Sequence, residues 1–294
     1  MESLRVGGVP EHFNMPWQLL LQSSKLSKKG IKASWKDFSG GTGAMIEALN
    51  NNEIDMAMLL TEGAVKGIDN GGRYRIVSFY VDSPLIWGIH IPGDAPYRHI
   101  DEMKGKTYAI SRYGSGSHLM SFVDAQIRGW RTDALKFIPV STLEGAREAF
   151  KENKADIFYW EKFTTKKYVD SGEFRRVGER PTPYACFVIC VTENALKEKQ
   201  AAVYKLIKQV FKVSKKLDKN PQRASLIAEY YQLDKKDVED WLASIRWTTK
   251  FNLDKKNLKK AIKILAGLNL VNADLKYRQL IWKKSLNGNA RIDL

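Results

Sequence analysis

Residues 31–60 read IKASWKDFSGGTGAMIEALNNNEIDMAMLL, and this stretch holds one complete unit of the fold. The pattern predicts a strand at 31–38, a glycine-rich loop at 39–43 and a helix at 44–51. Apart from Asp55, residues 54–60 are apolar, as strands are when both faces of a parallel sheet are buried. A strand, a helix and a second strand in this order indicate a parallel sheet covered by helices.

The same alternation continues on both sides of this stretch and then begins again. Further strands are expected at 4–9, 75–81, 106–111, 137–140 and 156–159, with helices at 15–27, 62–70, 118–128, 143–152 and 162–169. The two halves match at an offset of 101 residues, where Glu47, Ala48, Asn52 and Asp55 correspond to Glu148, Ala149, Asn153 and Asp156. Two lobes of similar architecture would produce such a repeat.

Two apolar, β-rich segments are expected to connect the lobes, at 83–92 on the way out and 184–192 on the way back. The chain of 294 residues also fits two lobes better than one core. Beyond Glu193 the pattern is nearly all helical and is expected to pack onto the first lobe. We therefore expect the following division: lobe 1 at 1–84 plus 193–294, lobe 2 at 92–184, and hinge strands at 85–91 and 185–192.

The composition is that of a soluble globular protein, 44% hydrophobic and 28% charged, with a net charge of +15. From Glu193 onward there are 23 Lys and Arg against 11 Asp and Glu, so this third carries +12 of the excess. Pairs such as Lys255-Lys256 and Lys259-Lys260 recur at helical spacing, which a solvated helix face explains. No nucleic-acid-binding motif accompanies them, so we expect no nucleic-acid partner.

The remaining residues with special chemistry indicate neither a metal site nor a disulfide. Cys186 and Cys190 lie four apart on an apolar strand, roughly 13 Å from each other, so they are expected to be buried and unlinked. The four histidines have no metal-ligand spacing. No apolar run approaches the roughly 18 residues of a membrane helix. The sequence shows no signal-peptide pattern and so indicates a cytoplasmic location, or a periplasmic one if a signal was removed.

Several motifs resemble those of the type II periplasmic-binding-protein superfamily, which includes the substrate-binding proteins of ABC transporters. They are Val9-Pro10-Glu11-His12, the loops at 39–43 and 111–117, Thr61-Glu62-Gly63, Ser83-Pro84-Leu85 and Trp160-Glu161. Within it the chain is most similar to sulfonate- and nitrate-binding receptors and the thiamine-pyrimidine-synthase family, and closest to a fungal and bacterial branch without an export signal. The resemblance covers about residues 1–190. It implies two lobes, each a mostly parallel sheet flanked by helices, with a C-terminal helical extension.

Each lobe is expected to present a glycine-rich loop where a strand ends and a helix starts. Helix N-termini attract anions there, and open α/β sheets bind ligands at this edge. The two loops are therefore expected to hold polar or anionic ligand atoms, the alternative being ordinary turn glycines. The candidates are Ser39, Gly40, Gly41, Thr42 and Gly43 in lobe 1, and Ser111, Arg112, Gly114, Ser115, Gly116 and Ser117 in lobe 2.

Six further candidates come from the same motifs: His12, Thr61, Glu62, Ser83, Trp160 and Glu161. His12 is expected either to donate to a ligand or to lie on the surface. Glu62 either favours a helix N-terminus or accepts N–H bonds from an amino-substituted heterocycle, with Glu161 as its counterpart. Trp160 either stacks on a ligand ring or packs in the core.

These features favour a binding protein that closes two lobes around a small polar, anionic or nitrogen-heterocyclic ligand, such as a metabolite that resembles the thiamine pyrimidine. No cofactor is expected. The alternative is an enzyme on the same fold, which the resemblance links to pyrimidine synthases and menaquinone-pathway lyases. The run at 185–190 lacks the contiguous cysteines of the synthases, and no P-loop, HExxH or GxSxG motif is present. A third interpretation is a regulator that docks a protein partner, of unknown identity, through the basic helices.

Overall fold

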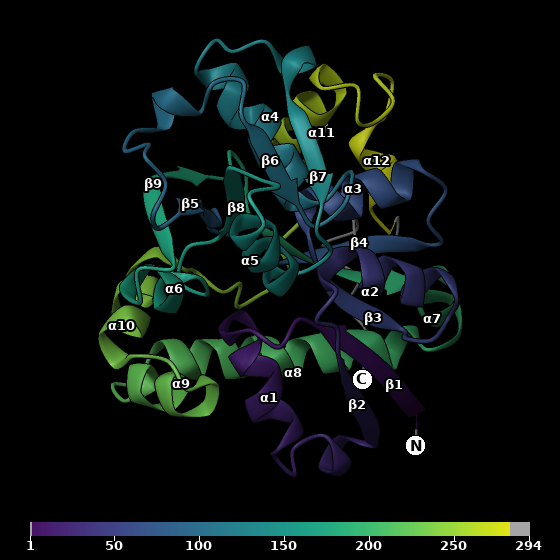
Figure 1. Cartoon of the computed structure of the whole chain (residues 1–294). Coiled ribbons are helices and arrows are strands. Elements are labelled where there is room, and N and C mark those ends of the chain that lie inside the picture. Colours follow the sequence, from purple (N-terminus) through teal and green to yellow (C-terminus); the bar gives the residue numbers. More distant parts are fainter. Residues whose placement is uncertain (1, 283–294) are drawn as a thin grey trace. The chain divides into compact units, whose positions relative to one another are not determined.

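The computed structural model describes residues 2–282, and the chain divides into two compact units. Unit 1 comprises the described residues up to Ser83 and from Tyr184 onward, and unit 2 runs from Pro84 to Pro183. The chain therefore leaves unit 1 once and returns once. Figure 1 shows a sheet with surrounding helices in each unit.

Unit 1 is built on a five-stranded mixed sheet in the order β2-β1-β3-β10-β4. Its strands are β1 (Glu2–Gly8), β2 (Ile31–Asp37), β3 (Met56–Leu60), β4 (Tyr74–Val81) and β10 (Phe187–Thr192). β1 pairs in parallel with β2 and β3, whereas β10 runs antiparallel to both β3 and β4. Four strands therefore point the same way, and β10, which follows the return crossing, is reversed.

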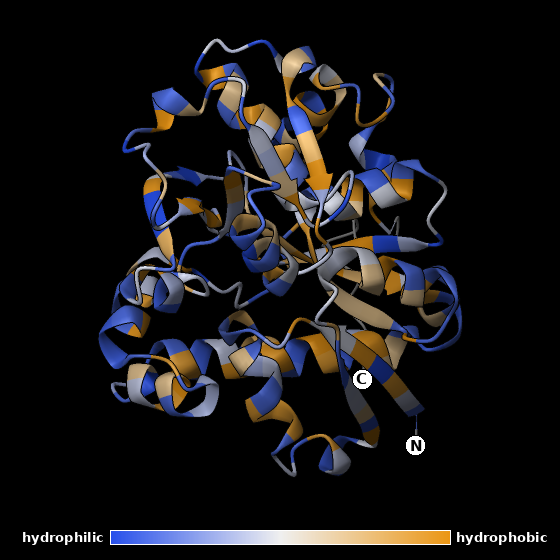
Figure 2. Cartoon of the chain, viewed as in Figure 1, coloured by the Kyte–Doolittle hydropathy of each residue, from blue (hydrophilic) through white to orange (hydrophobic). Residues whose placement is uncertain are grey.

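The helices of unit 1 come from both ends of the chain. Those before the crossing are η1 (His12–Asn14), α1 (Met15–Leu21), η2 (Ser27–Lys29), α2 (Gly41–Asn50) and α3 (Thr61–Asp69). Those after it are α7 (Glu193–Glu198), α8 (Gln200–Asp218), α9 (Arg223–Tyr231), α10 (Lys235–Ser244), α11 (Lys255–Gly267) and α12 (Tyr277–Leu280). α8 packs on α1, and α11 packs on α3, so the C-terminal helices cover unit 1 as expected. Along α8, hydrophobic residues recur at helical spacing (Figure 2), and these are the buried ones.

Unit 2 repeats the topology of unit 1, with a mixed sheet in the order β7-β6-β8-β5-β9. Its strands are β5 (Ile86–Pro92), β6 (Thr107–Ile110), β7 (Lys136–Pro139), β8 (Ile157–Glu161) and β9 (Phe174–Pro181). Again two parallel pairs are followed by one reversed strand, here β5. The accompanying helices are η3 (Ile100–Met103), α4 (Gly116–Ile127), η4 (Thr132–Ala134), α5 (Leu143–Lys151) and α6 (Lys166–Asp170).

The repeat at an offset of 101 residues has a structural basis. Asn52 and Asn153 both adopt left-handed backbone conformations, with φ of 54° and 53°. Each lies where its unit turns from a helix into a strand. Three residues later, the carboxylates of Asp55 and Asp156 each accept a backbone N–H of the neighbouring parallel strand, β1 or β6, at 2.7 and 2.9 Å. Matching residues therefore fix the same helix–turn–strand connection in both units.

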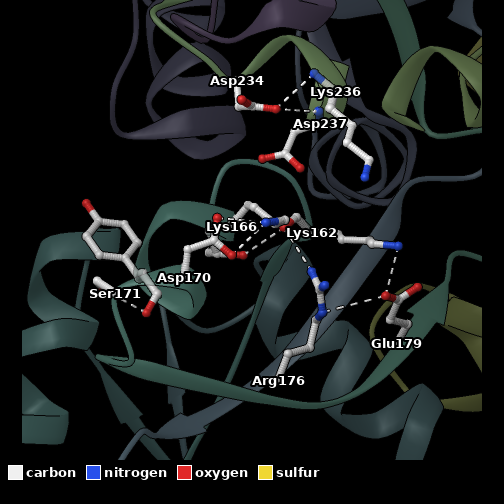
Figure 3. A network of polar contacts seen from close by, with 11 residues as sticks. Lys162, Lys166, Asp170, Ser171, Arg176, Glu179, Asp234, Lys236 and Asp237 are labelled. Carbon is white, nitrogen blue, oxygen red and sulfur yellow. Dashed lines mark hydrogen bonds and ion pairs between the residues drawn. The ribbon is translucent and has the colours of Figure 1, made fainter. Parts of the chain in front are cut away.

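Strand β9 is the one element of the two sheets that the sequence pattern did not predict. Its sequence, FRRVGERP, is rich in charge, which is unusual for an interior strand but typical of an edge strand. Figure 3 shows how the charges are used: Lys162 and Arg176 both approach the carboxylate of Glu179, at 2.9 and 3.6 Å. The strand is held by pairing with β5 rather than by apolar alternation.

Cys186 and Cys190 are buried, and they form no disulfide. None of the helices within residues 2–282 has the length and apolar character needed to cross a membrane.

Candidate functional site

The predicted site residues lie on loops that leave each sheet at one edge. Because β1, β2 and β3 are parallel, the loops that follow them emerge together at what we call the unit 1 edge. The loops after β6, β7 and β8 likewise form the unit 2 edge. The unit 1 edge carries His12, the 39–43 loop, Thr61 and Glu62. The unit 2 edge carries the 111–117 loop, Trp160 and Glu161.

The glycine-rich segment after β2 is shorter as a loop than expected, because α2 begins at Gly41, which has a positive φ of 67°. Ser39 and Gly40 are exposed, whereas Thr42 is buried. The Thr42 hydroxyl accepts the backbone N–H of Leu60 at 3.1 Å, and its methyl group packs against Gly63. Thr42 therefore joins the start of α2 to the end of β3. The N–H of Gly41, the first residue of α2, donates to the Phe38 carbonyl at 2.9 Å.

Glu62 is a buried carboxyl group at the start of α3, only 2% exposed. Within the described part of the chain, neither carboxylate oxygen has a well-formed hydrogen bond. Burial raises the pKa of Glu62 to about 7, although its own backbone N–H and the Tyr184 hydroxyl act in the opposite direction. The preceding residue is firmly anchored, since the Thr61 hydroxyl donates to the carbonyl of Ala185 at 2.6 Å. Glu62 is thus rigidly placed and has unused acceptor capacity.

His12 does not lie on the surface, because its side chain is only 3% exposed. The ring stacks on Phe13 at 5.0 Å between centroids and meets the face of Trp241 edge-on at 4.2 Å. Burial lowers the pKa of His12 to about 3, so the imidazole is neutral near pH 7. Its Nε2 atom is buried and has no hydrogen-bond partner among residues 2–282. The ring can therefore offer one N–H or one lone pair to a ligand.

A continuous series of contacts connects His12 with Glu62. Phe13 packs on Phe187 of β10 at 5.0 Å, and Phe187 pairs with Leu60, the last residue of β3. Leu60 is followed directly by Thr61 and Glu62. The unsatisfied atoms of His12 and Glu62 thus belong to one edge of one sheet.

Two polar residues at this edge, Asn14 and Thr248, are not among the predicted site residues. The Asn14 amide donates to the carbonyl of Val9 at 2.8 Å, but its Oδ1 atom is buried with no partner in the described structure. The Thr248 hydroxyl is likewise buried without a partner, while its N–H donates to Tyr80. Trp247 brings this segment to the edge, because its indole N–H donates to the Phe13 carbonyl at 2.9 Å. No local motif marks these residues, and Thr248 lies beyond residue 190, where the motif resemblance ends.

The unit 2 edge presents three serine hydroxyls at the start of α4. Ser117 Oγ lies 3.0 Å from Ser115 Oγ and accepts the N–H of Ser111 at 3.0 Å. Ser115 is the N-cap of α4 and accepts the N–H of His118 at 3.4 Å. Gly114 adopts a φ of 80°, and its N–H donates to His118 Nδ1 at 3.0 Å. Hydroxyls and helix-start N–H groups together form a site suited to an anion.

Glu161 differs from Glu62, although both are buried and burial raises the pKa of both. One Glu161 oxygen accepts the N–H groups of Phe163 and Thr164 at 3.0 and 2.7 Å, and the Thr164 hydroxyl at 2.8 Å. Its carboxylate therefore holds the turn after β8. Trp160 stacks on Phe158 at 5.1 Å and packs against the core of unit 2, the second of the two outcomes considered for it.

The remaining candidates divide between the two units. Arg112 is partly buried at the unit 2 edge, and burial lowers its pKa. The Ser83 hydroxyl accepts the N–H of Arg246 at 3.0 Å, so it fixes the end of the outgoing crossing to the C-terminal region. No group of three or more His, Cys, Asp or Glu side chains between residues 2 and 282 is placed to hold a metal ion.

Comparisons with known proteins agree with this architecture. The family described as Ca3427-like PBP matches residues 87–180, which lie in unit 2. The whole structure resembles that of the CA3427 gene product of Candida albicans, with 24% identity, a TM-score of 0.86 and coverage of 98% of this chain and 96% of that one. That protein is described as having the generic periplasmic binding protein fold. A comparison with curated proteins finds no match.

Two sulfonate receptors are also similar in structure. The alkanesulfonate-binding protein SsuA from Xanthomonas axonopodis pv. citri, bound to MOPS, has 16% identity, a TM-score of 0.78 and coverage of 95% of this chain and 98% of that one. The aliphatic sulphonate binding protein SsuA from Escherichia coli has 18% identity, a TM-score of 0.72 and coverage of 96% and 92%. The predicted two-lobed α/β fold with C-terminal helices is therefore confirmed.

Proposed function

We propose that this chain, which has the type II periplasmic-binding-protein fold, is a small-molecule-binding protein whose ligand contacts the unit 1 edge. The fold is the one found in the CA3427 product and in the two sulfonate receptors. Reversible capture by closure of two lobes, without covalent chemistry, is the mode of action that the sequence predicts.

The main support for the proposal is the buried carboxyl group of Glu62, which has no well-formed hydrogen bond among the described residues. A carboxyl group that is removed from water and has no well-formed hydrogen bond, only weak interactions with its own N–H and the Tyr184 hydroxyl, costs free energy in the unliganded protein. A ligand N–H group that binds there removes this cost, so part of the binding free energy is already present in the site. The orphaned atoms of His12 and Asn14 at the same edge have the same property.

The chemistry of Glu62 favours a ligand with N–H donors. A carboxyl whose pKa is about 7 pairs well with an amino-substituted, weakly basic ring, because either partner can carry the proton near neutral pH. The neutral imidazole of His12 and the surrounding aromatic rings suit a flat heterocycle. These features support an aminopyrimidine-like ligand. In unit 2, the serines at the start of α4 have by themselves the chemistry to bind an anion such as a phosphate or sulfonate.

A thermal-shift screen tests the proposal on the full-length protein. The panel contains aminopyrimidines with and without a phosphate, sulfonates including MOPS, nitrate, bicarbonate, thiamine and pyridoxal phosphate. A ligand at about 100 times its dissociation constant stabilises the fold by about 2.7 kcal/mol, which is easily detected. An absorbance band typical of a Schiff base with pyridoxal phosphate would instead support the enzyme alternative.

The variant Glu62→Gln, with the exposed Glu47→Gln as control, locates the site. Loss of a hydrogen bond to a charged group costs about 1.5–3 kcal/mol, so the affinity of an aminopyrimidine ligand should fall by roughly 10- to 100-fold in E62Q. E47Q should bind like the wild type. Equal binding by E62Q and wild type would exclude Glu62 from the site and remove the basis for the proposed ligand class.

A further inference from the structure

A concave site lies on unit 1, among its C-terminal helices. A groove of about 600 Å³ runs between α11 and α12, and we call it the α11–α12 groove. Its floor is apolar and includes Ile262 and Leu275, both buried. Its rim is basic and consists of Lys255, Lys259, Lys263, Lys276 and Arg278. None of the residues discussed for the carboxyl edges lines this groove.

The lysines of α11 form a row that the protein does not neutralise. Lys255, Lys259 and Lys263 are spaced four residues apart and so lie on one face of the helix, where like charges repel. None of the three forms an ion pair with any residue between 2 and 282. The nearby Asp254 is occupied in capping α11, where it accepts the N–H groups of Lys256 and Asn257.

The opposite wall of the groove adds charge and an aromatic face. Among the residues that the structure describes, Lys276 has a single ion pair, a 3.8 Å contact with the exposed Asp274. The Lys255 ammonium lies 5.1 Å from the centre of the Tyr277 ring. Arg278, Lys255 and Lys259 together lower the pKa of the Tyr277 hydroxyl, which shows that the potential there is positive. The interpretation of these lysines as a simple solvated face therefore leaves out the hollow that they surround.

We propose that the α11–α12 groove binds a small polyanion with an aromatic body, of the nucleoside di- or triphosphate class. The volume is within the usual 300–1,000 Å³ range of small-molecule sites. The row of lysines matches a chain of phosphates, and the apolar floor with Tyr277 matches a base. The occupant is a small molecule rather than a protein, because protein interfaces use about 20–30 residues a side. The apolar residues are buried rather than protruding, which is unsuited to insertion into a membrane surface.

A fluorescent ATP analogue, titrated into the full-length protein, tests this inference. Unlabelled ATP should displace the analogue at a concentration at least about tenfold lower than inorganic triphosphate or adenosine, because each carries only part of the matching chemistry. Equal displacement by inorganic triphosphate would overturn the proposal, since it would mean that the groove attracts any polyanion.

Charge reversal on α11 provides a matched comparison. The double variant K259E/K263E reverses two rim charges, whereas K256E/K260E makes the same change on the same helix at exposed positions that do not line the groove. We expect K259E/K263E to weaken ATP binding by at least about tenfold and K256E/K260E by less than about threefold, since exposed charges outside the site are screened. Similar losses in both variants would overturn the assignment. E62Q should leave this binding unchanged, so failure here is distinct from failure of the proposed function.

Discussion

Replacing Glu62 by glutamine should make the unliganded protein more stable at alkaline pH while it weakens ligand binding. The folded-state pKa of Glu62 is raised from the ordinary 4.5 to about 7, so ionisation in the folded state is unfavourable. At low pH the carboxyl is neutral in both the folded and unfolded states and has no effect. As pH rises from the unfolded to the folded pKa, the unfolded chain gains a stabilising ionisation that the folded chain resists. Stability is therefore lost across this interval and levels off above about pH 7.

The size of the effect follows from the two pKa values. The difference between the pKa of Glu62 in the unfolded and folded states corresponds to about 3 kcal/mol of stability, once the carboxyl is ionised in both states. Between about pH 5 and pH 8, the free energy of unfolding of E62Q should therefore rise relative to the wild type by about 2 kcal/mol. Glutamine is nearly isosteric and cannot ionise, so any cost of burying its amide is the same at both pH values.

Urea unfolding of the wild type, E62Q and the control E47Q at the two pH values measures this change directly. The control should follow the wild type, because Glu47 is exposed and no burial cost attaches to its charge. A difference between E62Q and wild type that does not vary with pH would refute the reasoning, since it would show that the folded protein already satisfies the Glu62 carboxylate.

Two further predictions concern the packing of each unit. In unit 2, the Asp124 carboxylate is fully buried and accepts from Arg128 and Arg180 at 2.8 and 2.5 Å, so Asp124→Ala should lower the free energy of unfolding by about 3–5 kcal/mol, measured by urea unfolding. In unit 1, Gly63→Ala should cost about 1–3 kcal/mol, because the new Cβ would lie 2.4 Å from the Thr42 methyl carbon. Adding Thr42→Ser removes that methyl group but keeps the hydroxyl, so the double variant should recover most of the lost free energy of unfolding. No recovery in the double variant would exclude this clash as the cause.

The sequence was sufficient to predict most of the fold because apolar periodicity directly reflects burial. β3 and β8 are hydrophobic on both faces, and the asparagines that precede them mark the turns. β9 was missed because it is an edge strand whose charges pair with neighbours rather than alternate with apolar residues. The starts of α2 and α4 were placed late because glycine, serine and threonine are typical of loops as well as of the first turn of a helix.

The candidate site was less predictable, because it depends on which polar atoms are left without partners after folding. His12 is enclosed by Trp241 of α10, more than 200 residues away in the sequence. Thr248 reaches the same edge through the bond from Trp247 to Phe13. Such long-range contacts leave no local pattern in the sequence. The loops could therefore be predicted, but not which of their polar atoms are buried without hydrogen-bond partners.

Glu62 and Glu161 show how the same residue type acquires different roles at corresponding edges. At the offset of 101 residues, Glu161 corresponds to Leu60, the last residue of a strand, and not to Glu62. From that position its side chain reaches forward to the N–H groups of Phe163 and Thr164, and the turn satisfies it. Glu62 is the second residue of α3, which follows β3 without an intervening turn, so its carboxylate has no such N–H groups ahead of it. The missing turn leaves the Glu62 carboxylate with acceptor capacity that Glu161 has used, and for this reason we assign ligand recognition to Glu62 and not to Glu161.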